Sequence, residues 1–147
     1  MSFLNRTIHG YYEVPTAGNP IRVPFVGRLR LTRDKVTERV RGEIDGEIDG
    51  EIVDRYGAAT IHGTLNKRIL RFEKQYEGRS DIIIFSLTRG GYTNEEDSFV
   101  GCYRHKEKLQ KVGQANCAIS RRDLVSTSLG LNLAQTSMNA IIQLAKK

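Results

Sequence analysis

Lys74 is the residue of this 147-residue chain whose position most strongly suggests chemistry. Leu70, Phe72 and Tyr76 occupy every second position around it, and Lys74 shares their parity. Successive side chains of a strand point to opposite faces, so the alternation predicts an amine on an otherwise apolar, inward face. A buried charge has to be paired or has to meet a ligand. Two interpretations follow: the amine reaches water from a strand end, or it orients a ligand in an apolar cavity.

Glu38 lies two positions from each of Val36 and Val40, so it shares a strand face with these apolar residues as Lys74 does with its own neighbours. In the second interpretation, Glu38 and Lys74 are polar groups of one interior. Tyrosines at inward parity offer an apolar ring with a hydroxyl, although such residues are commonly plain core. The predicted ligand-binding residues are Lys74, Glu38, Tyr76, Tyr103, Phe25 and Phe72.

A second candidate site is basic. The chain has 23 Lys plus Arg against 17 Asp plus Glu, which gives a formal net charge of +6. The planar guanidinium suits phosphate and carboxylate groups, and a positive surface attracts nucleotides, nucleic acid or an anionic membrane face. The alternative is a solvated surface that keeps the protein soluble, and no run of five like charges indicates a nucleic-acid tail. The predicted anion-binding residues are Arg22, Arg28, Arg30, Arg39 and Arg41.

An acidic ladder follows the arginines in the sequence. Its members are Glu43, Asp45, Glu47, Asp49 and Glu51. Part of the ladder matches the start of an EF-hand loop, but Tyr56 stands where the bidentate Glu belongs, and no flanking helices are predicted. We expect these carboxylates to face solvent, to pair with arginines across the sheet and to oppose edge-to-edge association.

The sequence supplies no established catalytic or metal motif. The three histidines, His9, His62 and His105, share no ligand spacing, and Cys102 and Cys117 form no Cys-x-x-Cys pair. The templates for a serine nucleophile, a P-loop, a dinucleotide site and a His-Glu-x-x-His zinc site are missing. We therefore predict no metal, no cofactor and a non-enzymatic protein, although missing motifs do not exclude an enzyme. Without a secretion signal we expect two reduced thiols, and a disulfide between Cys102 and Cys117 would require that they lie opposite each other.

The elements that must position these residues are strands. Residues alternate with period two over 21–31, 36–52, 59–65 and 70–76, and further strands are expected at 82–87, 99–103 and 115–119. The segment 36–52 exceeds a typical strand, so it either breaks near its glycines or bends there. About eight strands with short connections predict an all-β fold, an antiparallel up-and-down β-barrel. Side chains just fill a barrel of this size, or it holds one small ligand.

The C-terminal residues change to a helical period. Apolar side chains recur three or four positions apart at Leu131, Ala134, Met138, Ile141, Ile142 and Ala145. This spacing predicts a C-terminal amphipathic α-helix over 128–147, which either docks on the barrel, covers its mouth or forms a dimer seam. We expect a single domain over 1–147, with an N-terminal segment at 1–20 and the barrel at 21–125.

The order of these elements resembles the calycin-type barrels, which include lipocalins, fatty-acid-binding proteins and small bacterial relatives. The resemblance rests on the hairpin pattern of residues 63–76 and on the segments 99–103 and 113–119, and it covers roughly 21–120. It implies a small barrel that binds a ligand inside. The chain has no Trp, so the Gly-x-Trp signature of lipocalins is missing, and no lipocalin ligand residue is carried over.

Three functions are compatible with these patterns. The first is a non-enzymatic small-molecule-binding β-barrel with its ligand in the interior. The second is a nucleotide (second-messenger) or nucleic-acid-binding module that uses the arginine face. The third is an interaction or assembly protein, such as a homodimer formed through the C-terminal helix. No apolar run approaches the roughly 20 residues of a transmembrane segment, and the N-terminus lacks an apolar signal-peptide region, so we expect a cytoplasmic protein.

Overall fold

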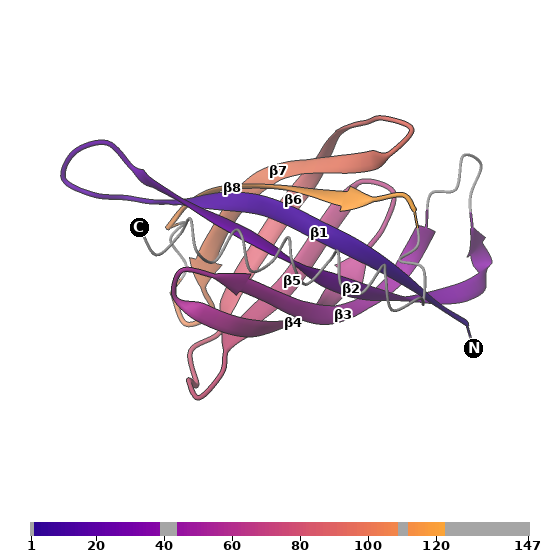
Figure 1. The fold of residues 1–147 in the computed structure, drawn as a ribbon, viewed down its shortest axis with the longest axis horizontal. Coiled ribbons are helices and arrows are strands. Elements are labelled where there is room, and N and C mark those ends of the chain that lie inside the picture. Colours follow the sequence, from indigo (N-terminus) through magenta and orange to yellow (C-terminus); the bar gives the residue numbers. More distant parts are fainter. Residues whose placement is uncertain (1, 39–43, 109–111, 123–147) are drawn as a thin grey trace, which may run out of the picture.

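The computed structural model describes residues 2–38, 44–108 and 112–122, which form eight strands. The strands are β1 (Ser2–Val14), β2 (Ile21–Glu38), β3 (Ile44–Asp54), β4 (Gly57–Leu65), β5 (Ile69–Tyr76), β6 (Ile83–Tyr92), β7 (Glu96–His105) and β8 (Gly113–Ser120). Each strand pairs antiparallel with the next, and β8 pairs with β1 to close the barrel (Figure 1). The predicted all-β, antiparallel, up-and-down barrel of eight strands is confirmed.

The structure differs from the sequence prediction at the N-terminus. Residues 1–20 were expected outside the barrel, but Ser2–Val14 pair along their length with β2, and Ile8 to Tyr12 pair with β8. The apolar alternation of β1 is interrupted at inward parity by Arg6 and Gly10, which conceals the strand in the sequence.

The long alternating segment 36–52 is divided between two strands, since β2 ends at Glu38 and β3 begins at Ile44. These two strands pair antiparallel with each other, so the expectation of a break rather than of one long bent strand is confirmed. The helix predicted over 128–147 lies outside the described residues, and so do Arg39 and Arg41.

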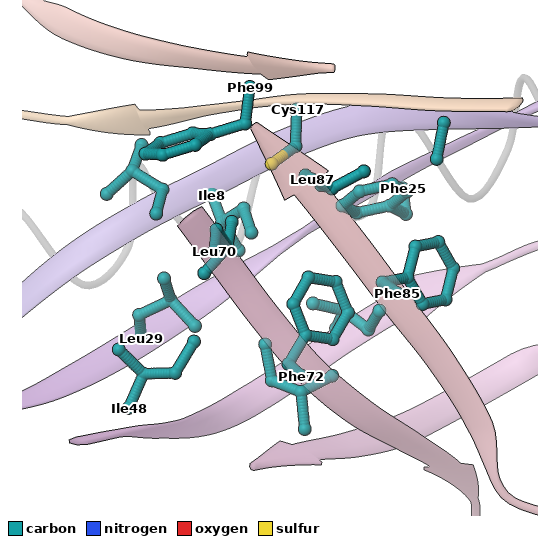
Figure 2. Close-up of a cluster of buried hydrophobic side chains, with 14 of the residues drawn as sticks. Ile8, Phe25, Leu29, Ile48, Leu70, Phe72, Phe85, Leu87, Phe99 and Cys117 are labelled. Carbon is teal, nitrogen blue, oxygen red and sulfur yellow. The ribbon is translucent and has the colours of Figure 1, made fainter. Parts of the chain in front are cut away.

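Aromatic rings occupy the centre of the barrel. Phe85 stacks on Phe72 with ring centroids 4.8 Å apart and on Tyr103 with centroids 5.3 Å apart. Tyr12 meets Phe85 edge to face at 6.0 Å. Aliphatic side chains such as Ile8 complete the core, and Figure 2 shows rings and aliphatic groups converging from strands on different sides of the barrel. Contacts of this geometry add to the stabilisation that burial of the rings provides.

Glycines allow neighbouring strands to approach closely where the sheet coils. A Cβ atom on Gly27 would lie 1.9 Å from the carbonyl oxygen of Glu51, and one on Gly50 would lie 2.1 Å from that of Arg28. Real Cβ atoms do not occupy such positions, so these sites require glycine. The glycines inside the alternating sequence therefore mark places where another backbone comes close, as at barrel corners.

The two ends of the barrel are built differently. The connections β1–β2, β3–β4, β5–β6 and β7–β8 lie at one end, which we call the Tyr56 end because Tyr56 occupies its shortest turn. The connections β2–β3, β4–β5 and β6–β7 lie at the opposite end, together with the start of β1 and the end of β8. The up-and-down order fixes this division, and it decides which side chains meet inside.

Candidate functional site

An ion pair is buried inside the barrel near the Tyr56 end. Among the described residues, Asp54 and Lys74 are the polar or charged side chains that are buried, with 3% and 1% of their surface exposed. The Nζ atom of Lys74 donates a hydrogen bond of 2.7 Å to Oδ2 of Asp54. The two residues come from β3 and β5, with β4 between them. Asp54 stands opposite Gly57 and Lys74 stands opposite Ile61, and the inward β4 residue between these two positions is Ala59.

Two tyrosine hydroxyls complete the cluster. Tyr76 donates to Oδ2 of Asp54 at 2.5 Å, and Tyr12 reaches the same oxygen at 2.9 Å. The hydroxyls of Tyr12 and Tyr76 lie 3.0 Å apart, and Nζ of Lys74 donates to the Tyr76 hydroxyl at 2.7 Å. We call Tyr12, Asp54, Lys74 and Tyr76 the Asp54–Lys74 cluster. Three donors therefore converge on one carboxylate oxygen, Oδ2 of Asp54.

Aromatic rings surround the amine of Lys74. Its Nζ atom lies 4.5 Å from the ring centroid of Tyr12, 4.3 Å from that of Tyr76 and 5.8 Å from that of Phe85. A cation over a ring face is attracted to it, most strongly where water is excluded. Asp54 and Tyr76 accept two of the three N–H donors of an ammonium. No described residue accepts the third.

The tight turn after β3 holds the carboxylate in place. Asp54 is the last residue of β3, and its Oδ1 atom accepts the backbone N–H of Tyr56 at 2.8 Å. Gly57 follows with φ at 130°, a conformation that favours glycine, and it starts β4. One carboxylate oxygen therefore organises the turn while the other faces the cluster, so the local sequence fixes the orientation of Asp54.

Burial sets the ionisation of the cluster. The low polarity around Lys74 lowers the pKa of its amine below the ordinary 10.5, and the Asp54 carboxylate opposes this shift. Burial raises the pKa of Tyr12, and its hydrogen bond to Tyr76 adds to the shift. Burial also raises the pKa of Tyr76, and here the hydrogen bond to Asp54 contributes. The cluster thus combines an amine that is easier to deprotonate, a carboxylate and two neutral phenols.

Several residues predicted from the sequence do meet here. Lys74 and Tyr76 belong to the cluster itself, while Phe25 and Phe72 are buried among the aromatic rings of the barrel core. Tyr103 is buried against Phe85, but its hydroxyl donates to the backbone oxygen of Glu13 at 2.7 Å rather than to the cluster. The strand-end interpretation of Lys74 is wrong, because its side chain does not reach water.

Glu38 is not brought to Lys74. It ends β2 at the far end of the barrel from the Tyr56 end, and its side chain lies outside the described residues. Among the described residues, the carboxylate that pairs with Lys74 is that of Asp54, which was not among the ligand-binding residues predicted from the sequence. Asp54 continues the every-second-residue pattern of Ile48 and Ile52, so the alternation could have predicted that its side chain points inward.

The arginine face lies on the outer wall of the barrel. Arg22 pairs with Glu13 at 3.4 Å and lies over the ring of Tyr11, with 4.4 Å to its centroid. Arg30 pairs with Asp49 at 3.4 Å, and Arg28 stands opposite Glu51 in the β2–β3 register. The expected pairing of arginines with the acidic ladder is confirmed for Arg30 and Asp49. A shallow groove on this outer surface is lined by charges of both signs, including Arg28 and Glu51.

The cysteines occupy different faces of the sheet. Cys117 is buried and stands opposite Phe99, whereas Cys102 is half-buried and stands opposite Gln114, and both are free thiols. Burial raises the pKa of the Cys117 thiol, which makes it unreactive. Within the described ranges, no group of three or more His, Cys, Asp or Glu side chains is arranged to hold a metal ion.

Fold and site together define a closed antiparallel β-barrel of eight strands that buries a hydrogen-bonded ion pair among aromatic rings. No protein-family model, curated protein or solved structure matches this chain. In the part of the chain that the structure describes, no helix has the length and apolar character needed to cross a bilayer.

Proposed function

We propose that this protein is a small-molecule-binding β-barrel of the calycin-like kind, with its ligand held inside at the Tyr56 end. The observation that carries the proposal is the burial of Asp54 and Lys74 in one hydrogen-bonded cluster. Removing two charges from water costs several kcal/mol per ion, and an apolar core of similar volume is often at least as stable. The cluster therefore makes most sense as a group of polar contacts for a ligand.

The composition of the cluster and its wall indicates the kind of ligand. Binding sites for small molecules combine apolar and aromatic walls with a few polar groups that fix orientation. The wall here is aromatic, including Phe72 and Phe85, and the polar groups are an ammonium, a carboxylate and two phenols. We infer a small, largely apolar ligand with one hydrogen-bond acceptor directed at Lys74.

Entry of the ligand takes place at the Tyr56 end. The rings inside the barrel are in contact with one another, so a ligand displaces side chains rather than entering open space. Tyr56 is 47% exposed in the two-residue turn that follows Asp54. Movement of this turn would alter the hydrogen bond between Oδ1 of Asp54 and the Tyr56 N–H, which links entry to the cluster.

Native mass spectrometry tests the proposal. The protein is purified gently, and a second sample is incubated with a library of small apolar acids, carbonyl compounds and phenols. We expect one bound molecule per barrel. We expect Tyr76→Phe to weaken binding by about 10- to 150-fold, since a lost hydrogen bond to a charged group costs about 1.5–3 kcal/mol. Tyr103→Phe is the matched control, because its hydroxyl lies outside the cluster. Failure of every compound to bind, or equal binding by both variants, would overturn the proposal.

A further inference from the structure

We propose that Lys74 forms a Schiff base with a small aldehyde or ketone inside the barrel. The inference rests on the proposed function, because the carbonyl compound has to reach the Asp54–Lys74 cluster. It goes beyond that function by assigning a covalent reaction to one atom, Nζ of Lys74, and by limiting the ligand to one chemical class.

The surroundings of Nζ favour the neutral amine that such a reaction requires. The atom lies among the rings of Tyr12, Tyr76 and Phe85, with 1% of the Lys74 side chain exposed. Desolvation in an apolar pocket is one of the recognised ways in which proteins activate a lysine nucleophile. A surface lysine, such as Lys106 with its side chain 51% exposed, lacks this environment.

Asp54 is placed to move the proton. Its Oδ2 atom already accepts a hydrogen bond from Nζ at 2.7 Å, so transfer along this bond gives a neutral amine and a neutral carboxylic acid. The Nζ lone pair then attacks the carbonyl carbon, and a proton passes from nitrogen to the former carbonyl oxygen to give the carbinolamine. Asp54 returns its proton to the hydroxyl group, which leaves as water. The balance is one ammonium and one carbonyl compound giving one iminium and one water, with Asp54 restored as a carboxylate.

The two tyrosine hydroxyls donate hydrogen bonds to the carbonyl oxygen of the aldehyde or ketone. The Tyr76 hydroxyl lies 2.7 Å from Nζ and 2.5 Å from Oδ2 of Asp54, so it connects the nucleophile with the acid. The Tyr12 hydroxyl lies 3.0 Å from that of Tyr76. A carbonyl oxygen that displaces one of these contacts receives a phenol donor as its charge develops, which is the placement that general acid catalysis needs.

Reductive trapping of the native protein tests the inference. Propanal and sodium cyanoborohydride convert an iminium into a stable propyl amine, and peptide mapping reports the labelling rate of each lysine in the same sample. We expect Lys74 to be labelled faster than Lys106 at neutral pH, because the apolar surroundings lower the pKa of its amine and raise the fraction of free amine. In concentrated urea the two rates should become equal.

Two variants separate the proposed role from simple exposure. Asp54→Asn removes the acid that protonates the departing hydroxyl group while keeping a group that can accept the Tyr56 N–H. We expect it to slow labelling of Lys74 without changing that of Lys106, because loss of this acid outweighs the larger fraction of free amine. Tyr103→Phe should leave both rates unchanged. Where Asp54→Asn does not fold, the comparison of Lys74 with Lys106 in the wild type decides alone.

The outcomes distinguish this inference from the proposed function. If library compounds bind in the mass spectrometer while Lys74 stays unlabelled, the barrel binds ligands and the Schiff-base inference is wrong. If neither binding nor labelling occurs, both proposals are wrong. If Lys74 is labelled no faster than Lys106, the amine has no special reactivity and the inference is overturned.

Discussion

The Nζ atom of Lys74 on β5 lies 2.7 Å from Oδ2 of Asp54 on β3, across the intervening strand β4. The pair therefore crosses the sheet rather than joining adjacent strands. The hydroxyls of Tyr12 and Tyr76 add donors to the same carboxylate oxygen. Four side chains from the three strands β1, β3 and β5 thus meet at one point. Their energetic coupling can be measured.

Removing one member of the ion pair should destabilise the barrel strongly. Lys74→Met preserves the length of the side chain but leaves the Asp54 carboxylate buried without its partner. We expect a loss of about 3–5 kcal/mol in the free energy of unfolding, measured by urea denaturation at neutral pH. The double variant with Asp54→Asn should lose less than the sum of the two single changes. Additive losses would show that the pair is not coupled.

Alkaline pH should destabilise the protein through its buried tyrosines. Burial raises the pKa of Tyr103 from 10.0 to about 12, so the unfolded chain releases this proton first as pH rises. The associated stability is fully present below pH 10 and is lost as pH rises through about 12. The raised pKa values of Tyr12 and Tyr76 act in the same direction.

The lowered pKa of Lys74 changes the stability of the protein with pH in the opposite direction. Because its pKa is lowered in the folded state, the unfolded chain binds more protons between the folded pKa and 10.5, and stability rises with pH across that window. Urea titrations of wild type, Lys74→Met and Tyr103→Phe at a series of pH values test both signs. The wild type should lose stability relative to Tyr103→Phe between pH 10.0 and about 12. A constant difference would contradict the burial of the Tyr103 hydroxyl.

Much of the fold was predictable because strand alternation is a local signal. The positions of Phe72, Lys74 and Tyr76 on one inward face follow from parity alone, and the structure confirms them. The same alternation places Asp54 on the inward face of its strand. The sequence cannot show which carboxylate from another strand meets Lys74, since that depends on the register between strands and on the closure of the barrel. Glu38 has suitable parity and still lies at the wrong end of the barrel.

The glycine positions offer a test of the close strand approach. Gly27→Ala places a methyl group against the backbone of β3, where the Glu51 oxygen would be 1.9 Å away. We expect a loss of about 1–3 kcal/mol, typical of overpacking. Gly18→Ala is the control, because nothing lies within 4 Å of its added atom. Thermal unfolding of the two variants should differ clearly, and equal midpoints would refute the predicted clash.

The two cysteines should react at very different rates. Cys117 is 5% exposed and burial raises the pKa of its thiol, whereas Cys102 is half-buried on the other face of the sheet. A thiol reagent should label Cys102 in the native protein and Cys117 only after unfolding. The Cys102→Ser variant should show no fast labelling. Fast modification of Cys117 would mean that the barrel wall opens there.

The central claim is that a ligand binds inside at the Tyr56 end, and amide NMR of the labelled protein tests it most directly. The sample is titrated with the library compound that binds best in the mass spectrometer. The account predicts shifts for the amides of Asp54, Tyr56 and Lys74, with those of Arg28 and Arg30 on the outer wall unchanged. Shifts confined to the arginine residues, or to any surface away from the Asp54–Lys74 cluster, would contradict it.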